Sequence, residues 1–139
     1  MYKKIEKSKI YRLINTGPLV LASTRSKQGK RNIAPIAWAC PAEMDPPRVL
    51  ICVDKGHRTY KNIRETGYFV VCVPHKKQVE LIKKTGAVSG NDTDKFEAFK
   101  IKAAGRTGAG ALVPEGVIGS VSYTHLRAHE TVLDLVCRL

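Results

Sequence analysis

Three segments of the chain carry the residue types of a ligand site, and the first is residues 32–40, Asn-Ile-Ala-Pro-Ile-Ala-Trp-Ala-Cys. Pro35 has no amide hydrogen, so it predicts a strand end or a bulge. The small residues would let a flat ligand lie against the backbone, and Trp38 would form an aromatic wall. These small residues are Ala34, Ala37 and Ala39. The alternative is an ordinary edge strand with a core tryptophan, which this stretch alone favours.

The other two segments are polar loops. Residues 54–59 read Asp-Lys-Gly-His-Arg-Thr, and residues 89–95 read Ser-Gly-Asn-Asp-Thr-Asp-Lys. Thr59 has the side chain to cap a helix that begins there. The sequence offers no spacing typical of a catalytic triad or a metal site. We therefore expect no catalytic residue and no metal, and any redox chemistry would belong to a cofactor.

Charge is the strongest signal in the composition. The chain has 139 residues, which is one domain's length, and 24 Lys and Arg against 12 Asp and Glu give a net charge of +12. Such a balance favours an anionic partner, whether a nucleic acid, a membrane surface or a phosphorylated small molecule. The aromatic residues are few and scattered, which disfavours base stacking. A well-solvated basic surface is the alternative reading of most of these charges.

The chain carries no sign of a membrane span or of export. No apolar run approaches about 20 residues, and the basic N-terminus leads into no apolar signal-peptide region. We expect a cytoplasmic protein. The four cysteines form no C-x-x-C pair and are interpreted as small hydrophobic residues: Cys40, Cys52, Cys72 and Cys137.

Apolar runs and turn residues predict a mostly β fold with short helices. Strands are expected at residues 19–24, 32–40, 48–53 and 68–73, the last two buried on both faces, and a further strand begins within 112–120. The prolines of residues 41–47 predict a loop. Short helices are expected at residues 59–66, closed by Gly67, and 78–85, closed by Gly86, with a helical turn at 95–99. This order favours a closed antiparallel barrel.

The last segment, residues 121–139, differs in character from the rest. It resembles a translated sequencing-adapter segment, so we expect the domain to span residues 1–120 and the tail to be foreign to it. The alternative is a C-terminal amphipathic helix. Its apolar side would carry Leu126, Leu133, Val136 and Leu139.

Four motifs in this order, residues 32–38, 53–63, 66–71 and 85–96, resemble the flavin reductase-like, FMN-binding split-barrel family. Within it the flavoredoxin-type proteins are the nearest likeness. The resemblance implies an antiparallel split β-barrel of the FMN-binding type. Family members commonly continue with further strands after the equivalent of Ser120, so the resemblance also implies that this domain is truncated at its C-terminus.

The resemblance assigns cofactor-binding roles residue by residue. Residues 32–38 would line the isoalloxazine, with Asn32 bonded to it and Trp38 beside it, while Thr59 and Lys95 would hold the phosphate. A hydroxyl, a helix N-terminus and a lysine do make an anion site. His57 and Arg58 would assist, or else belong only to the surface. The full predicted set is Asn32, Ile33, Ala34, Pro35, Trp38, His57, Arg58, Thr59, Ser89, Gly90 and Lys95.

The resemblance implies a flavin-dependent oxidoreductase that binds FMN. Electrons would come from a nicotinamide nucleotide, NAD(P)H, or from a partner protein, and the protein would be a homodimer. Two alternatives stay open. One is a basic module for anions or nucleic acid, which rests on the charge alone, and the other is a split barrel that resembles pyridoxine-phosphate oxidases.

Overall fold

The computed structural model describes residues 18–129 and 134–138. The strands are β1 (Val20–Arg25), β2 (Arg31–Ile36), β3 (Ala39–Met44), β4 (Pro47–Cys52), β5 (Phe69–Val73), β6 (Ala103–Arg106), β7 (Leu112–Pro114), β8 (Gly119–Tyr123), β9 (His125–His129) and β10 (Asp134–Arg138). The helices are α2 (Arg58–Thr66), the 3-10 turn η2 (Lys76–Gln78), α3 (Val79–Ala87) and α4 (Lys95–Ala98). The expected fold, mainly β with short helices, is confirmed.

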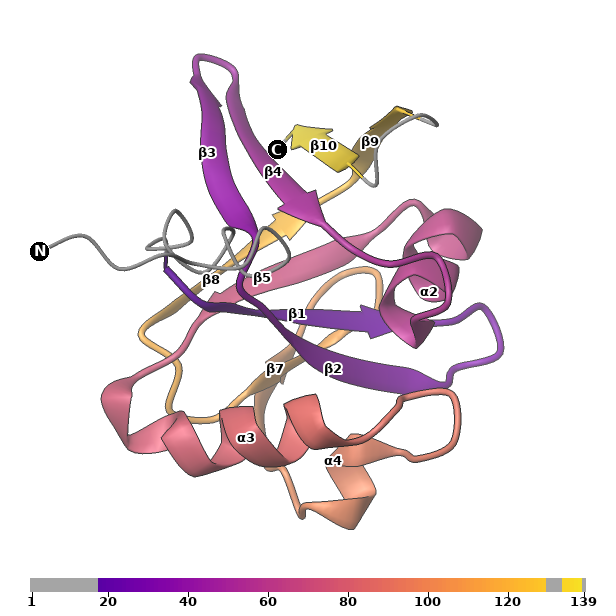
Figure 1. The fold of residues 1–139 in the computed structure, drawn as a ribbon, viewed down its shortest axis with the longest axis vertical. Coiled ribbons are helices and arrows are strands. Elements are labelled where there is room, and N and C mark those ends of the chain that lie inside the picture. The colour runs from indigo at the N-terminus through magenta and orange to yellow at the C-terminus, as the bar shows by residue number, and fades with distance from the viewer. Residues whose placement is uncertain (1–17, 130–133, 139) are drawn as a thin grey trace, which may run out of the picture.

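All strand pairs are antiparallel and form three sheets. The first sheet has the order β2-β1-β5-β8, the second has β3-β4-β10-β9, and β6 pairs with β7. Helices α3 and α4 pack beside β2, and α2 packs beside β1 and β2 (Figure 1). Strand β2, at the edge of the first sheet, contains most of the first candidate segment. The helices next to the other two segments, α2, α3 and α4, all contact it.

The core lies on both sides of the first sheet. Strand β5 alternates between the two sides, because Phe69 and Val71 pack in one cluster and Val70 and Cys72 in the other. The expected burial of this strand on both faces is confirmed. For β4 the same expectation is wrong, because Ile51 is fully buried but Val49 and Leu50 are only partly so. The second sheet contributes to the core from one face.

The expected strand over residues 32–40 is divided in two. It bends at Ala37 and Trp38, so β2 belongs to the first sheet and β3 to the second. The loop expected at residues 41–47 is also wrong, because β3 and β4 form a hairpin there. Prolines fit this hairpin because β3 is at the edge of its sheet among the described residues, and Pro41 borders an irregularity in its pairing.

Two helix boundaries differ from the expectation. Helix α2 begins at Arg58 with His57 as its N-cap, so Thr59 lies inside the helix and is not its cap. Gly67 closes α2 as expected, with a φ of 68° that favours glycine. Helix α3 runs through Gly86 and ends at Ala87, so Gly86 does not terminate it. Its last turn thereby reaches the side of β2.

The C-terminal residues that the structure describes form strands, so the amphipathic-helix alternative is wrong. Strand β10 pairs with β4 over five residues and with β9 on its other side. Strand β8 runs past Ser120, and the ring of Tyr123 is buried and stacks on Phe69 at 5.3 Å between centroids. The packed core thus includes Tyr123. The domain boundary and the foreign origin of the tail stay predictions, and the basic N-terminal segment lies outside the described residues.

Candidate functional site

A cleft of about 400 Å³ opens beside β2. Its walls come from β2 and the bend after it, from the loop that leads into α2, and from the segment between the end of α3 and the start of α4. This volume is in the range of small-molecule and cofactor sites. Three segments far apart in the sequence therefore meet at one cavity. Figure 1 shows the elements that carry them, β2, α2, α3 and α4.

Ten of the eleven sequence-predicted site residues line this cleft. They are Asn32, Ala34, Pro35, Trp38, His57, Arg58, Thr59, Ser89, Gly90 and Lys95. Ile33 does not, because strand alternation turns its side chain to the opposite face of β2, where it is fully buried in the core. The structure thus brings the three segments together and excludes Ile33 as a side-chain contact.

Other lining residues were not predicted as site residues. Four of them lie at the end of α3 and just after it: Thr85, Gly86, Ala87 and Val88. These four were missed in the sequence because the helix was expected to end at Gly86. Gly86 packs closely on Pro35, because a Cβ on this glycine would lie 3.1 Å from the proline ring. This contact, which would have identified Gly86 as a lining residue, is visible only in the structure. The remaining ones are Ile36, Ala37, Cys52 and Asp54.

Trp38 lies in the lining of the cleft and is 49% exposed. The core-tryptophan alternative is therefore wrong. The bend between β2 and β3 places this side chain outside both hydrophobic clusters. Asn32 is the second residue of β2, and Trp38 lies two residues beyond the end of that strand. The cleft is therefore elongated along β2, with an aromatic residue toward one end.

Asn32 is the most constrained polar residue at the other end. It is 1% exposed, and its Nδ2 donates to Thr59 Oγ1 at 2.9 Å, while its Oδ1 has no hydrogen-bond partner in the structure. A Cβ on Gly90 would lie 1.9 Å from that Oδ1 and 3.1 Å from the Cβ of Arg58. Gly90 is thus required for the loop to close on Asn32. A buried, unpaired acceptor is costly unless a ligand donor satisfies it.

The N-terminus of α2 faces the cleft without a side-chain cap. His57 makes no capping hydrogen bond, and the first turn of the helix holds no acidic residue. Its first amides therefore keep their positive partial charge for another acceptor. Arg58 adds a full charge, and its Nε is buried without a hydrogen-bond partner. This end of the cleft is electropositive.

Lys95 brings a second cation to the cleft. It is 4% exposed, and its Nζ donates to the carbonyl oxygen of Thr85 at 2.5 Å. Burial lowers the pKa of Lys95 from its ordinary value. The carbonyls at the end of α3 oppose this effect, because a helix C-terminus favours a cation. An ammonium group has three donors, so two of them can serve an anion in the cleft.

Asn91 holds the two polar loops together next to the cleft. Its Nδ2 donates to the carbonyl of Gly56 at 2.9 Å, and its Oδ1 accepts from Lys61 Nζ at 3.1 Å. Its own carbonyl accepts from Lys30 Nζ at 3.0 Å. One side chain and its backbone thereby join the hairpin turn before β2, the approach to α2 and the loop before α4. This cross-linking fixes the electropositive end.

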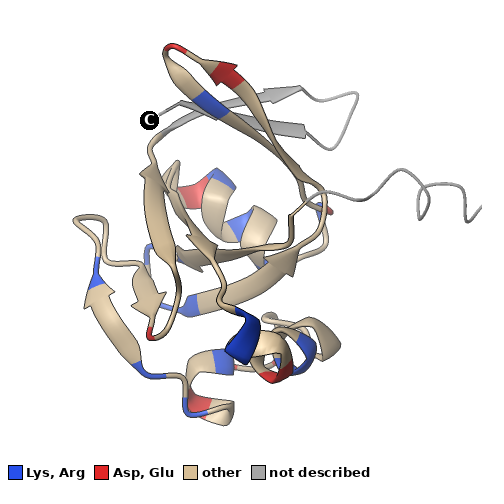
Figure 2. Cartoon of the chain, turned by 90° about the vertical axis from the view of Figure 1, so that its left-hand side faces the viewer, with Lys and Arg blue, Asp and Glu red and all other residues tan. Residues whose placement is uncertain are grey.

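Two further observations limit the chemistry. No group of three or more His, Cys, Asp or Glu that could hold a metal occurs among the residues the structure describes. In that same part of the chain, no helix is long and apolar enough to cross a membrane. Lysine and arginine are spread over several strands, helices and loops (Figure 2). The cleft is where positive groups and an aromatic side chain share one cavity.

Comparisons with known proteins agree with the fold. A 91-residue stretch is 41% identical to an Escherichia coli protein named uncharacterized protein YddH and covers 65% of this chain. An FMN-binding domain of a flavin reductase-like enzyme from Shewanella baltica superposes with a TM-score of 0.81 at 27% identity, covering 97% of this chain and 72% of that one. Flavoredoxin of Desulfovibrio vulgaris superposes with a TM-score of 0.75 at 24% identity, and the match covers 87% of this chain and 66% of the flavoredoxin. This likeness shows the same split-barrel fold.

This chain is shorter than its relatives. It spans about half the length of the curated proteins it matches, 48% in one case and 54% in the other. The family model for the flavin reductase like domain nevertheless matches residues 11–134, which is most of the sequence. The predicted resemblance is confirmed, and the chain belongs to the flavin reductase-like family.

Proposed function

We propose that this chain binds FMN in the cleft beside β2 and serves as a flavin-dependent oxidoreductase domain. The observation that carries the proposal is the convergence of Thr59, Lys95 and the uncapped N-terminus of α2 at one end of an elongated cleft. The other part of the cleft is lined by small and aromatic side chains. FMN has the same two parts, because its flat ring matches the small and aromatic side chains and its phosphate matches the positive end.

The residues present fit the cofactor. Asn32 Oδ1 is buried and unpaired beside Thr59, so it needs a donor such as a hydroxyl of the chain that joins the ring to the phosphate. Gly86 and Gly90 let their segment pack closely against Pro35 and Asn32, which forms one wall of the cleft. Lys95 and Arg58 supply charge for a phosphate, and charge-assisted bonds of this kind are about twice as strong as neutral ones.

FMN, when bound, supplies the hydride and electron transfer itself. The protein has to hold the phosphate, orient the ring against β2 and leave one face open. The half-exposed Trp38 lies where it can border that open face. The FMN-binding domain from Shewanella baltica supports this assignment through its likeness.

The electron donor is either a nicotinamide nucleotide or a redox protein, and the working form is a cytoplasmic homodimer. These parts of the proposal come from the family resemblance. The positive charge of +12 is compatible with both donors, because each would present phosphates or acidic side chains.

A binding titration tests the cofactor. Purified protein is titrated with FMN, with riboflavin, which lacks the phosphate, and with pyridoxine phosphate, which lacks the isoalloxazine. We expect FMN to bind and shift its visible spectrum, and riboflavin to bind roughly 10- to 150-fold more weakly, which corresponds to 1.5–3 kcal/mol for a charge-assisted contact. A flavin spectrum and fluorescence that do not respond to the protein would refute FMN binding. Preference for pyridoxine phosphate would assign the cleft to that ligand.

A further inference from the structure

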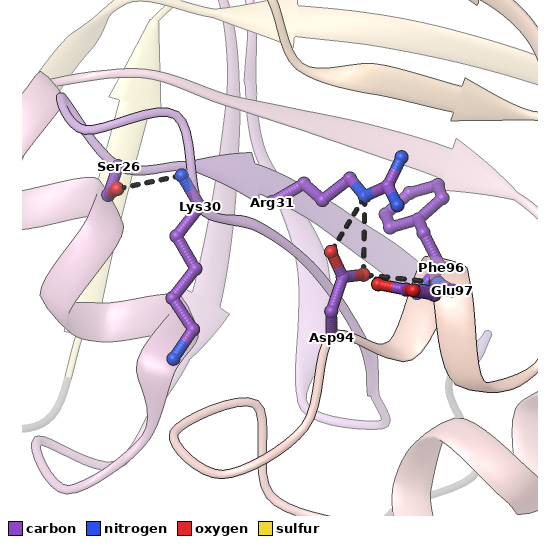
Figure 3. Close-up of polar contacts among 6 residues, drawn as sticks. All are labelled: Ser26, Lys30, Arg31, Asp94, Phe96 and Glu97. Carbon is purple, nitrogen blue, oxygen red and sulfur yellow. Dashed lines mark hydrogen bonds and ion pairs between the residues drawn. The ribbon is translucent and has the colours of Figure 1, made fainter.

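An ion pair joins the two elements that carry the polar ligands of the cleft. Arg31, on β2, donates from Nε to both carboxylate oxygens of Asp94, at 2.9 and 3.2 Å. Figure 3 shows the two side chains meeting between the strand and the start of α4. The two side chains are 39% and 30% exposed, so the pair is partly shielded from water.

Asp94 has a second task at the same place. As the N-cap of α4 its Oδ1 accepts from the amides of Phe96 at 2.9 Å and Glu97 at 3.2 Å. Lys95 is the next residue after this cap and the first of the helix. The direction in which its side chain leaves the backbone is therefore set by how the Asp94 carboxylate is held.

Arg31 reaches α4 in a second way. Its guanidinium carbon lies 5.6 Å from the centroid of the Phe96 ring, within the range of a cation–π contact. Phe96 is 2% exposed and packs in the core cluster against which Ile82 of α3 also packs. The next residue after Arg31 is Asn32, the buried polar residue of the cleft. One side chain thus spans the gap between the strand that carries Asn32 and the helix that carries Lys95.

We propose that Arg31 and Asp94 are positioning residues that hold Lys95 in register with Asn32 and Thr59 at the phosphate end of the cleft. This inference rests on the proposed FMN function. Neither residue lines the cleft, so both act through their neighbours in the chain. Binding sites need their ligands held within about 0.5 Å, which partner side chains achieve by restricting movement.

The test uses two variants that remove the ion pair in different ways. Asp94→Ser keeps an N-cap side chain but is too short to hold Arg31, and Arg31→Met keeps an unbranched chain without the charge. The matched control is Lys83→Met, which removes the exposed pair of Lys83 and Glu80 on α3, away from the cleft. Dissociation constants for FMN and riboflavin are measured for each variant by fluorescence.

The informative quantity is the preference for FMN over riboflavin. We expect both variants to reduce it about three- to tenfold, a size in keeping with ion pairs of modest strength, and the control to leave it unchanged. In a Lys95→Met background, Arg31→Met should cause no further loss of preference, since its effect passes through Lys95.

Three outcomes would overturn the inference. An unchanged preference in both variants, equal weakening for both ligands, or a full additional loss in the Lys95→Met background would each show that the ion pair does not position Lys95. These results differ from a failure of the proposed function. In that case the unmodified protein itself would bind neither flavin, or bind both equally.

Discussion

Replacing Lys95 by methionine is expected to distinguish two effects of this residue, its contribution to FMN binding and its effect on the stability of the fold. Methionine has a similar length and no charge, and the site is 4% exposed, so the change preserves shape at a buried position. The bond from Nζ to the Thr85 carbonyl is lost, and so is the cation for the FMN phosphate. Only the second loss depends on the ligand.

The size of the binding effect follows from the contact it removes. A charge-assisted hydrogen bond contributes roughly 1.5–3 kcal/mol, so FMN should bind Lys95→Met about 10- to 150-fold more weakly. Riboflavin has no phosphate, and its affinity should change little. Calorimetric or fluorescence titrations with both ligands measure this difference. Equal losses for FMN and riboflavin would refute the reasoning and show that Lys95 acts through the fold.

The same lysine predicts how stability depends on pH. Burial lowers the pKa of Lys95 in the folded protein, so between that value and its ordinary value the unfolded chain holds more protons. The contribution of this group to stability therefore rises with pH across that window, and it is unfavourable and constant below it. Lys95→Met should lack this rise in denaturant titrations at alkaline pH. FMN affinity should fall over the same window, because the neutral amine no longer attracts the phosphate.

Three other changes test separate parts of the structure. Gly90→Ala should abolish FMN binding, because the new Cβ would lie 1.9 Å from Asn32 Oδ1. Gly108→Ala is the control, since a Cβ there would have nothing within 4 Å, and it should leave FMN affinity unchanged. Equal FMN affinities for the two variants would show that the loop moves aside. Trp38 is the only tryptophan and lines the cleft, so saturating FMN should quench its emission, and unaltered emission would place the ring elsewhere. Tyr123→Ala should destabilise the fold by about 3–5 kcal/mol in urea titrations, as for buried aromatic residues, while a loss below about 1 kcal/mol would show that β8 does not belong to the core.

Local patterns in the sequence were sufficient for the central elements of the fold. The run of residues 68–73 is apolar on both of its faces, and the structure buries both faces of β5. Gly67 was identifiable as the end of α2 because a left-handed residue there favours glycine. The three segments of the cleft were identified by the family resemblance of four motifs in order, because residues 32–40 by themselves favoured an ordinary edge strand.

Other features depended on which sheet a strand joins. Residues 32–40 read as one apolar strand, but Ala37 and Trp38 mark the point where the chain passes from the first sheet to the second. No local preference specifies that transition, because β2 pairs with β1, which precedes it, while β3 pairs with β4, which follows it. The same transition creates the open end of the cleft and leaves Trp38 half exposed.

The sequence by itself determined that a strand, a helix N-terminus and a lysine-bearing loop have the residue types of an anion and ring site. Only the tertiary structure decided that Lys95 bonds to Thr85, that Ile33 turns into the core, and that Asn91 and the pair of Arg31 with Asp94 lock the loops. Residue types follow from the chain alone. Distances between segments 30 to 63 positions apart follow from packing against a shared core, which no single segment encodes.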